Sequence, residues 1–453
     1  MKRSILILLI TIGLFSTLHA QWTSPGNGTT YTLPDLVNVT DGVVTNNGTV
    51  FTIHQDLTIS SNDILEIDNQ VTRINAAAIL ITINGSMVCT NNGNNRVGLF
   101  GLNETEHFSM RFENATACTI KKMYFSDGAG IKVIDSEVTF DDVKFFYFTR
   151  DYCNAVIDIF NCDPVIKNCY FQDNEGAAIS SPANGQSSPQ ILNNILDANV
   201  NGINSPQINL GPGGRDTIRI VNNEIYDRWA TWHVGGISVA DLMATGSTKV
   251  LLKDNVVRDG RYGYNQQGAT ISSVITGNQF IDNYNEDNPM NGGSGISIYG
   301  SSINNKAILR GNTITGNLWG ITAINLHDIN MGTENDWGNN NIHDNGNGGV
   351  VYDLYNNSAC DIMAVGNDWG TSDQRLIESH IFHQHDDPSL GLVTFIPFIG
   401  YDHLEDIILD PNVLDLSEAA IYTITGQRVN TESLKPGVYI AVMKQSTKKI
   451  IIQ

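Results

Sequence analysis

The sequence predicts an all-β protein whose body is a parallel β-helix, a solenoid in which every coil adds a short strand to each of several continuous sheets. The first observation is a recurring phrase, apolar-x-x-Asn-x-apolar-x-Asp/Gly-Asn/Gly, which begins at Ile191, Ile220, Leu252, Ile275, Leu309 and Trp337. The second is a short strand carrying Gly and an apolar residue, which follows each phrase. Alternating βα units would need helical periodicity between the strands, and a propeller would show a blade period of roughly forty residues. Neither pattern is found.

The Asn of the phrase holds one shared position in seven successive coils: Asn194, Asn223, Asn255, Asn278, Asn312, Asn340 and Asn367. Residues two apart in a strand point to the same side, and an apolar residue recurs two positions after each Asn. We therefore expect both columns to face the coil interior. Stacked amides can hydrogen-bond up such a column, whereas an unpaired buried amide costs roughly 1–3 kcal/mol.

The same alignment extends towards the N-terminus, where Met123, Val143 and Cys169 take the Asn position. The apolar column comprises Phe125, Phe145, Phe171, Leu196, Ile225, Val257, Phe280, Ile314, Ile342 and Trp369. Residues before these coils form β-rich phrases separated by Asn and Gly turns, as expected for the less regular terminal repeats of a solenoid. We predict that the β-helix occupies residues 21–400.

Residues 1–20 have the pattern of a secretory signal peptide. Lys2 and Arg3 precede an apolar run, and Leu18, His19 and Ala20 offer a cleavage site of small residues. Nothing later in the chain is long and apolar enough to cross a bilayer. The sequence therefore predicts an exported protein, either secreted or associated with the cell surface at the outer membrane.

The end of the solenoid is expected to carry a short helix between Asp373 and His383, followed by a strand that ends at Pro397. Residues 401–416 are acidic and are expected to form a linker to a separate β unit at 417–453. The prediction for this last unit is a strand, a turn at Gly426, a second strand from Gly437 and a terminal strand.

Three elements of the tail give it a family resemblance. They are the Tyr-x-x-x-Gly-x-x-Val of Tyr422 to Val429, the Leu-x-x-Gly-Val-Tyr of Leu434 to Tyr439, and the pair Lys448 and Lys449. The tail resembles the type A C-terminal sorting domain of the type IX secretion system of Bacteroidetes. This resemblance implies secretion machinery as a partner and removal of the tail after export. The family's Asn-Pro-rich opening and first strand pair are missing or degenerate here, and the alternative is a small β-hairpin appendage.

Charge and cysteine usage exclude two other classes of protein. The net charge of -21 argues against nucleic-acid binding, because a phosphate backbone is bound by clustered Lys and Arg. Six scattered cysteines are too few for a disulfide scaffold, and no CxxC pair suggests structural zinc. We expect most of them to be buried thiols, although export would permit a bridge among Cys153, Cys162 and Cys169.

The coil phrase also resembles the pectate-lyase-like superfamily of right-handed parallel β-helices. This resemblance implies a right-handed coil but no particular reaction, because the same fold serves lyases, hydrolases, epimerases, tailspikes and adhesins. The clustered catalytic Asp of the hydrolases and the Asp-Pro-His-Glu motif of the epimerases are not found in the sequence.

Loop lengths suggest where a ligand would bind. Three consecutive coils have long connections, at 228–235, 260–268 and 283–294, and stacking must place these loops side by side in one wall. Aromatic rings suit sugar faces, Arg suits a uronate carboxylate, and a lyase needs a base. The candidate catalytic residues are His233, Arg261 and Tyr262, and the candidate substrate-binding residues are Arg228, Trp229, Trp232, Tyr264, Tyr284, Glu286 and Asp287.

Two functions stay open at the level of sequence. One is a carbohydrate-active protein that binds, and in the stronger form processes, an acidic polysaccharide on the loop wall. The other is a non-catalytic surface adhesin or structural spacer, for which we expect every Arg of the wall to be paired with a carboxylate. No cofactor is required by either.

Two groups of residues offer ligands for a metal ion. The Asp column Asp173, Asp227, Asp259, Asp282 and Asp344 offers the oxygen ligands that Ca²⁺ takes, although Asp in this position more often caps turns. His380, His383 and His385 are close in sequence, and we expect a polar closing loop there.

Overall fold

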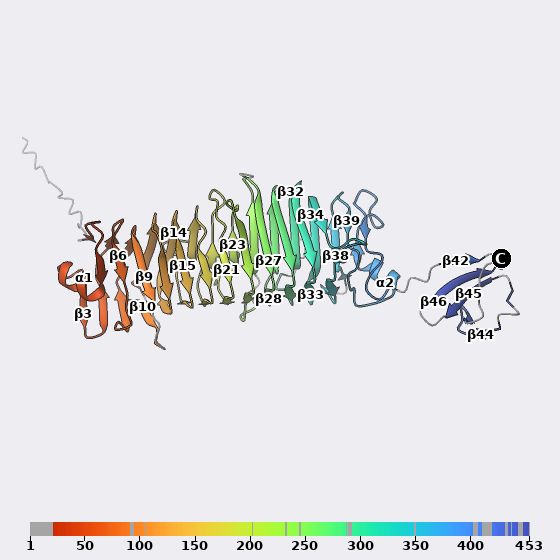
Figure 1. Cartoon of the computed structure of the whole chain (residues 1–453), viewed down its shortest axis with the longest axis horizontal. Helices are drawn as coiled ribbons and strands as arrows, with labels where there is room; N and C mark the ends of the chain where they lie inside the picture. Colours follow the sequence, from red (N-terminus) through yellow and green to blue (C-terminus); the bar gives the residue numbers. More distant parts are fainter. Residues whose placement is uncertain are drawn as a thin grey trace, which may run out of the picture. The chain divides into compact units, whose positions relative to one another are not determined.

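The computed structural model describes residues 21–90, 95–103, 105–201, 203–231, 233–243, 246–286, 288, 292–347, 350–401, 406–409, 419–430, 434–435, 437–442 and 447–452. The chain divides into two compact units, Met1–Phe395 and Ile396–Gln453. The first unit is a right-handed parallel β-helix whose coils follow one another along one axis (Figure 1).

Each coil contributes a strand to three stacks, which we number by their order within a coil. Stack 1 contains β1 (Trp22–Thr23), β5 (Leu57–Ile59), β8 (Leu80–Ile83), β11 (Phe108–Glu113), β14 (Gly128–Ile134), β17 (Ala155–Phe160), β20 (Ala177–Ser180), β23 (Ser205–Leu210), β26 (Val234–Asp241), β29 (Tyr264–Gly268), the first parts of β32 (Ser294–Arg310) and β34 (Trp319–Asn330), β38 (Leu354–Asn357) and β40 (Ile381–Phe382). Stack 2 contains β2 (Thr30–Thr32), β6 (Ile64–Glu66), β9 (Ser86–Thr90), β12 (Cys118–Lys121), β15 (Val138–Asp141), β18 (Val165–Lys167), β21 (Gln190–Leu192), β24 (Thr217–Val221), β27 (Thr248–Lys253), β30 (Ile271–Thr276), the last parts of β32 and β34, β39 (Ile362–Met363) and β41 (Val393–Thr394). Stack 3 is a separate sheet of β3 (Val44–Asn47), β4 (Val50–Ile53), β7 (Arg73–Ala76), β10 (Val97–Gly101), β13 (Met123–Ser126), β16 (Lys144–Phe146), β19 (Tyr170–Gln172), β22 (Ile195–Asp197), β25 (Glu224–Tyr226), β28 (Val256–Arg258), β31 (Gln279–Ile281), β33 (Thr313–Thr315) and β35 (Asn341–His343).

The predicted interior columns are confirmed. Every residue of the apolar column is at most 2% exposed, and Phe145 stacks on Phe125 and Phe171 with ring centroids 5.5 and 4.6 Å away. The Asn ladder is continuous from Asn194 to Asn367, with side-chain amide to amide-oxygen distances of 2.8 to 3.0 Å. Parallel stacking thus satisfies amides that would otherwise destabilise the core.

A second ladder was not predicted. Asn174 donates to Asn199 (2.6 Å), and further along the axis Asn283 donates to Asn317 and Asn317 to Asn345 (3.0 and 2.9 Å). These residues hold the last position of the coil phrase. The same position is Arg228 and Gly260 in the two coils between Asn199 and Asn283, so the second ladder is interrupted there.

The two ends of the solenoid are closed differently. At the N-terminal end lies α1 (Leu33–Val39), a helix absent from the prediction, whose N-cap Thr32 forms a capping box with Asp35 and which buries Leu33 and Leu36 (Figure 1). At the other end, the predicted helix is present as α2 (Gln374–Ser379), N-capped by Asp373. The strand predicted to end at Pro397 is shorter, because β41 stops at Thr394.

The second unit is a small sheet in the order β42 (Asp406–Leu409), β46 (Thr447–Ile452), β45 (Gly437–Val442), β43 (Ala420–Thr423) and β44 (Arg428–Val429). The predicted turn at Gly426 has φ +82° and joins β43 to β44. β42 lies inside the segment expected to be a linker. The hairpin β36 (Gly346–Asn347) and β37 (Val350–Val351) belongs to the first unit. No helix in the described residues has the length and apolar character needed to cross a membrane.

Candidate functional site

The predicted wall residues lie in the loops that lead from stack 3 to stack 1, and the structure divides them into two groups. Arg228 and Trp229 turn back over the outer surface of stack 3. Arg261, Tyr262 and Glu286 lie beside the outer surface of stack 1. Trp232 and Asp287 lie outside the described residues.

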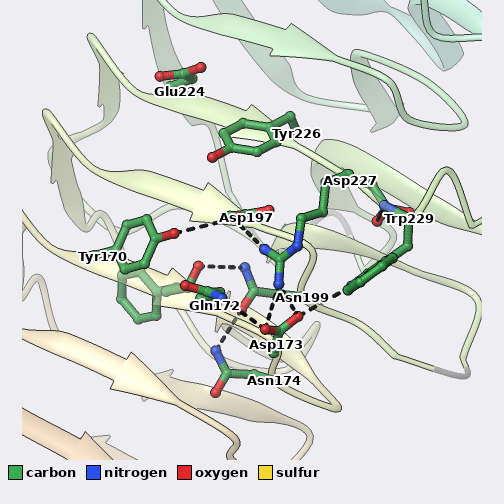
Figure 2. A network of polar contacts seen from close by, with 12 residues as sticks. Tyr170, Gln172, Asp173, Asn174, Asp197, Asn199, Glu224, Tyr226, Asp227 and Trp229 are labelled. Carbon is green, nitrogen blue, oxygen red and sulfur yellow. Dashed lines mark hydrogen bonds and ion pairs between the residues drawn. The ribbon is translucent and has the colours of Figure 1, made fainter.

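Arg228 is the centre of the first group, and Figure 2 shows its partners Asp173, Asp197 and Trp229. Its guanidinium forms ion pairs with Asp173, at 2.5 Å, and with Asp197, and it lies 5.0 Å from the ring centroid of Trp229. The indole N–H of Trp229 donates to Asp173 (3.2 Å), and the hydroxyl of Tyr170 donates to Asp197 (3.2 Å). Two carboxylates from two different coils therefore hold one guanidinium.

The interrupted ladder explains why Arg228 reaches this place. A guanidinium is too long for the ladder position that Asn199 holds one coil earlier, so it extends outward and back across two coils. The preceding residue, Asp227, is buried and accepts hydrogen bonds from the backbone N–H groups of Trp229 (3.1 Å) and Thr231 (2.6 Å). These bonds fix the start of the loop, which places Trp229 with 62% of its surface exposed.

The network sets the ionisation of its members. Burial opposes ionisation of Asp173, but hydrogen bonds from Gln172, Trp229 and Arg228 outweigh it and lower the pKa of that carboxyl. Burial, followed by the charge and hydrogen bond of Asp197, raises the pKa of Tyr170 to about 12. At neutral pH the first group therefore contains ionised Asp173 and a protonated Tyr170.

The second group is also internally paired. Arg261 contacts Glu286 (Nε to Oε2, 3.5 Å) and donates to the side chain of Asn204 (2.7 Å), and the side chains of Arg261 and Glu286 are only 12% and 8% exposed. The ring of Tyr262 covers Gly235, where a Cβ atom would come within 2.3 Å of the ring. Burial raises the pKa of Tyr262 to about 12 despite the opposing influence of Arg261 and Ser238. A base at neutral pH is not available from this hydroxyl.

The remaining predicted residues are dispersed. Tyr264 is fully buried in the core, where its hydroxyl donates to Gln266 (3.2 Å), so it does not line the outer surface. Tyr284 is half exposed on the third loop. His233 is half-buried immediately before β26.

Sequence reasoning missed a pocket on the outer face of stack 1. It has a volume of 360 Å³ and is adjacent to the second group, because Asn204 both lines the pocket and bonds Arg261. Its lining residues are mostly polar and comprise Arg150, Asn154, Asp158, Ala177, Ser180, Ser181, Pro182, Ile203, Asn204, Ser205 and Asn209.

Asp158 is the one ionisable carboxyl of this pocket. Burial raises its pKa, while the hydroxyl of Ser180 (2.8 Å) and the charge of Lys132 on the neighbouring coil oppose the rise. In register along the axis lie Lys132, Asp158, Ser180, Asn209 and Ser238, a polar row across five coils. The available signal was the strand Ala155–Phe160, where a single Asp interrupts an apolar run.

The structure places the Asp candidates at turns, where Asp173, Asp227, Asp259 and Asp344 also form side-chain hydrogen bonds. Asp173, Asp259, Asp282 and Asp344 have positive φ and cap the turns after stack 3. Within the described ranges, the one group of three ligand-type side chains close enough for a metal is Glu378, His383 and His385.

The hydrogen bonds of this group do not fit a metal centre. His383 Nδ1 accepts the backbone N–H of Val393 (2.9 Å), so the neutral ring carries its proton on Nε2, which lies 2.8 Å from Glu378. A metal on that nitrogen would require an imidazolate. The group is the polar closing loop that the sequence predicts, and Glu378 also contacts His385 (2.5 Å).

All six cysteines are free thiols. Burial raises the pKa of Cys153 and of Cys169 to about 12, so these two stay protonated at neutral pH.

Comparisons with known proteins agree with the fold. Residues 235–375 match the family described as "Protein of unknown function (DUF1565)". Crystal structures of the periplasmic alginate epimerase AlgG, as wild type and as a mutant, superpose with TM-score 0.51 at 12% identity, covering 82% of this chain and 83% of theirs. No curated protein sequence matches the chain. The chain is thus a right-handed parallel β-helix protein, and at 12% identity the likeness to the epimerase is one of fold.

Proposed function

We propose that the protein is exported and binds an acidic polysaccharide in the pocket beside Asp158, along the outer face of stack 1, without cleaving it. The observation that carries this proposal is the composition of the pocket. Arg150 and three Asn side chains offer donors to a sugar carboxylate and hydroxyls in a recess of 360 Å³, and the Ser180 oxygen, whose proton is donated to Asp158, can accept from a sugar hydroxyl.

Two cations favour an acidic ligand. Arg150 makes a single long hydrogen bond to Asn154 (3.4 Å), and Lys132 lies over the ring of Tyr152, 4.5 Å from its centroid. Neither forms an ion pair within 4 Å among the described residues. By contrast, Arg228 and Arg261 are held by carboxylates, so Arg150 in the pocket lining, with Lys132 on the neighbouring coil, is better placed to receive a uronate.

The same contacts argue against a lyase. Arg261 is engaged by Glu286, and the hydroxyl of Tyr262 stays protonated at neutral pH. Pairing of the loop-wall Arg residues with carboxylates is what a non-catalytic surface protein would have, so we favour binding without turnover.

Binding is tested by titrating the purified protein with alginate, pectate and glycosaminoglycans in a calorimeter, with and without Ca²⁺. We expect Arg150→Ala to weaken binding about 10-fold, the loss of one charge-assisted hydrogen bond. Unsaturated products and new reducing ends are followed in the same samples, and we expect none.

The matched control is Arg375→Ala, because Arg375 is equally an exposed Arg, on α2, with its side chain 94% exposed. Equal losses of affinity in the two variants would indicate a general charge effect and would contradict binding in the pocket. Unsaturated products that disappear in His233→Ala would overturn the non-catalytic part of the proposal.

We also propose that residues 417–453 are a type IX sorting signal, supported by the Tyr422–Val429 and Leu434–Tyr439 motifs. In a host with that secretion system, deletion of 417–453 should leave the protein in the periplasm, whereas Arg375→Ala should be exported normally. Surface delivery of the deleted chain would contradict this role.

A further inference from the structure

The outer face of stack 3 carries a strip of aromatic side chains that the proposed function does not use. Six consecutive coils, from β10 to β25, each place one large apolar side chain on this face: Phe100, Tyr124, Phe146, Tyr170, Ile195 and Tyr226. At about 4.8 Å per coil, the strip is about 24 Å long. All six side chains are partly exposed to solvent.

Three of the rings form a connected surface. Ring centroids lie 6.1 Å apart for Tyr124 and Phe146 and 5.9 Å apart for Phe146 and Tyr170. Two further rings flank the strip and are more exposed, Tyr147 at 55% and Trp229 at 62%. Trp229 is fixed there by its bond to Asp173, as Figure 2 shows.

Charges along the strip cancel. Arg96 pairs with Asp142, Arg228 with Asp173 and Asp197, and Arg258 with Glu224 and Asp259, while Arg73 and Lys144 lie over rings of the strip and bring the cations to five against these five carboxylates. The strip is therefore electrically balanced, although the chain as a whole carries -21. Guanidinium groups also pack on rings, with Arg73 4.0 Å from the centroid of Phe100 and Arg258 4.3 Å from that of Tyr226.

These features select one class of ligand. A partly polar aromatic surface packs against the C–H faces of sugar rings while its hydroxyls and paired charges serve sugar hydroxyls. Balanced charge removes any preference for an anion. The coil spacing is close to the length of one pyranose residue in an extended chain, so successive coils can meet successive sugars.

We propose that this aromatic strip is a second binding surface, for an extended uncharged polysaccharide that lies parallel to the solenoid axis. It is separate from the pocket beside Asp158 and differs from it in the charge of its ligand. The strip would hold a neutral matrix glycan while the pocket takes an acidic one.

The test uses the full protein with insoluble cellulose and chitin in sedimentation assays, and with a soluble neutral β-glucan in affinity electrophoresis. Tyr147→Ala and Trp229→Ala should each weaken binding to the neutral polymer about 10-fold, because each removes one exposed ring that would pack against a sugar. Alginate binding should be unchanged in Tyr147→Ala.

The matched controls are Tyr284→Ala and Trp337→Ala, which remove rings of 50% and 40% exposure away from the strip. Aromatic pairs across strands also stabilise a sheet, so unfolding midpoints of all four variants are measured. The proposal is overturned if the wild type does not bind the neutral polymers. It is also overturned if the strip variants and the control variants lose the same amount of affinity. If Arg150→Ala loses only alginate binding, the proposal for the aromatic strip is unaffected. The proposals for the strip and for the pocket can therefore fail independently.

Discussion

At the scale of single residues, Asp158 is a carboxyl for which burial outweighs the favourable effect of Ser180 and Lys132. Its pKa is raised on balance, whereas the polar partners of Asp173 outweigh burial and lower the pKa of that carboxyl. Natural proteins keep such unfavourable groups mostly at functional sites, where stability is given up for binding. Asp158, in the proposed binding pocket, and Asp173, in the Arg228 network, are therefore shifted in opposite directions.

The pH dependence of Asp158→Asn follows from the sign of this shift. A raised pKa means that the folded protein binds the extra proton, so the native state loses stability as pH rises through the folded pKa. This loss of stability is absent below the pKa of Asp in the unfolded chain, about 3.9. We therefore expect Asp158→Asn to be more stable than the wild type at pH 7 and equal to it near pH 3.5, measured by thermal unfolding. A variant that is less stable at pH 7 would show that Asp158 serves the fold.

For Arg228 we predict the opposite effect on stability, a loss at pH 7 when the side chain is replaced. The pKa of Asp173 is lowered in the folded protein. Its ionised carboxyl therefore contributes its full stabilisation above the pKa of the unfolded state, and this stabilisation is lost as pH falls through the pKa of the folded state. Arg228→Met leaves Asp197, 7% exposed in its side chain, without its cation. We expect a loss of about 1–3 kcal/mol at pH 7, which shrinks as the solution is acidified. Denaturant unfolding at pH 7 and pH 3 measures both, and a pH-independent loss would rule out the ion pairs as its cause.

At the scale of elements, the Asn ladder makes the coils depend on one another. Asn255 accepts from both the backbone N–H and the side-chain amide of Asn223 (3.0 and 2.9 Å) and donates to Asn278. Asn255→Ala should therefore leave two buried donors unsatisfied and cost about 2–5 kcal/mol. Asn304→Ala, at an exposed Asn of β32, should stay within about 0.5 kcal/mol of the wild type. Similar chemical-denaturation midpoints for the two variants would mean that the ladder adds no stability.

The elements also show how far the sequence could be interpreted. The first ladder and the apolar column were predictable because the periodicity of a strand fixes which residues share the interior. The second ladder was visible as the last Asn of the phrase, and its replacement by Arg228 and Gly260 was the available sign of an unusual loop. Loop order alone could not show that Arg228 folds back over stack 3 while Arg261 turns towards stack 1, because each choice depends on partners in other coils. Asp158 was missed because a single Asp that interrupts an apolar strand does not by itself distinguish a pocket from an ordinary polar position on the outer face.

At the scale of the whole molecule, both proposed surfaces belong to a protein with a net charge of -21. Long-range repulsion slows the approach of an anionic glycan and is screened within about 10 Å at 0.1 M salt. It has no effect on an uncharged glycan. The local cations Arg150 and Lys132 act in the opposite direction, but only at contact distance.

This balance predicts different salt responses for the two surfaces. Raising ionic strength from about 0.01 to about 0.15 M should increase the association rate with alginate, because screening removes the repulsion of the whole protein before it weakens the contacts in the pocket. The rate for a neutral β-glucan at the aromatic strip should not change. Surface plasmon resonance with immobilised glycans measures both rates. If the association rate with alginate falls as salt is added, the local cations dominate the approach of the glycan. If binding of the neutral glycan depends on salt, its site lies away from the charge-balanced strip.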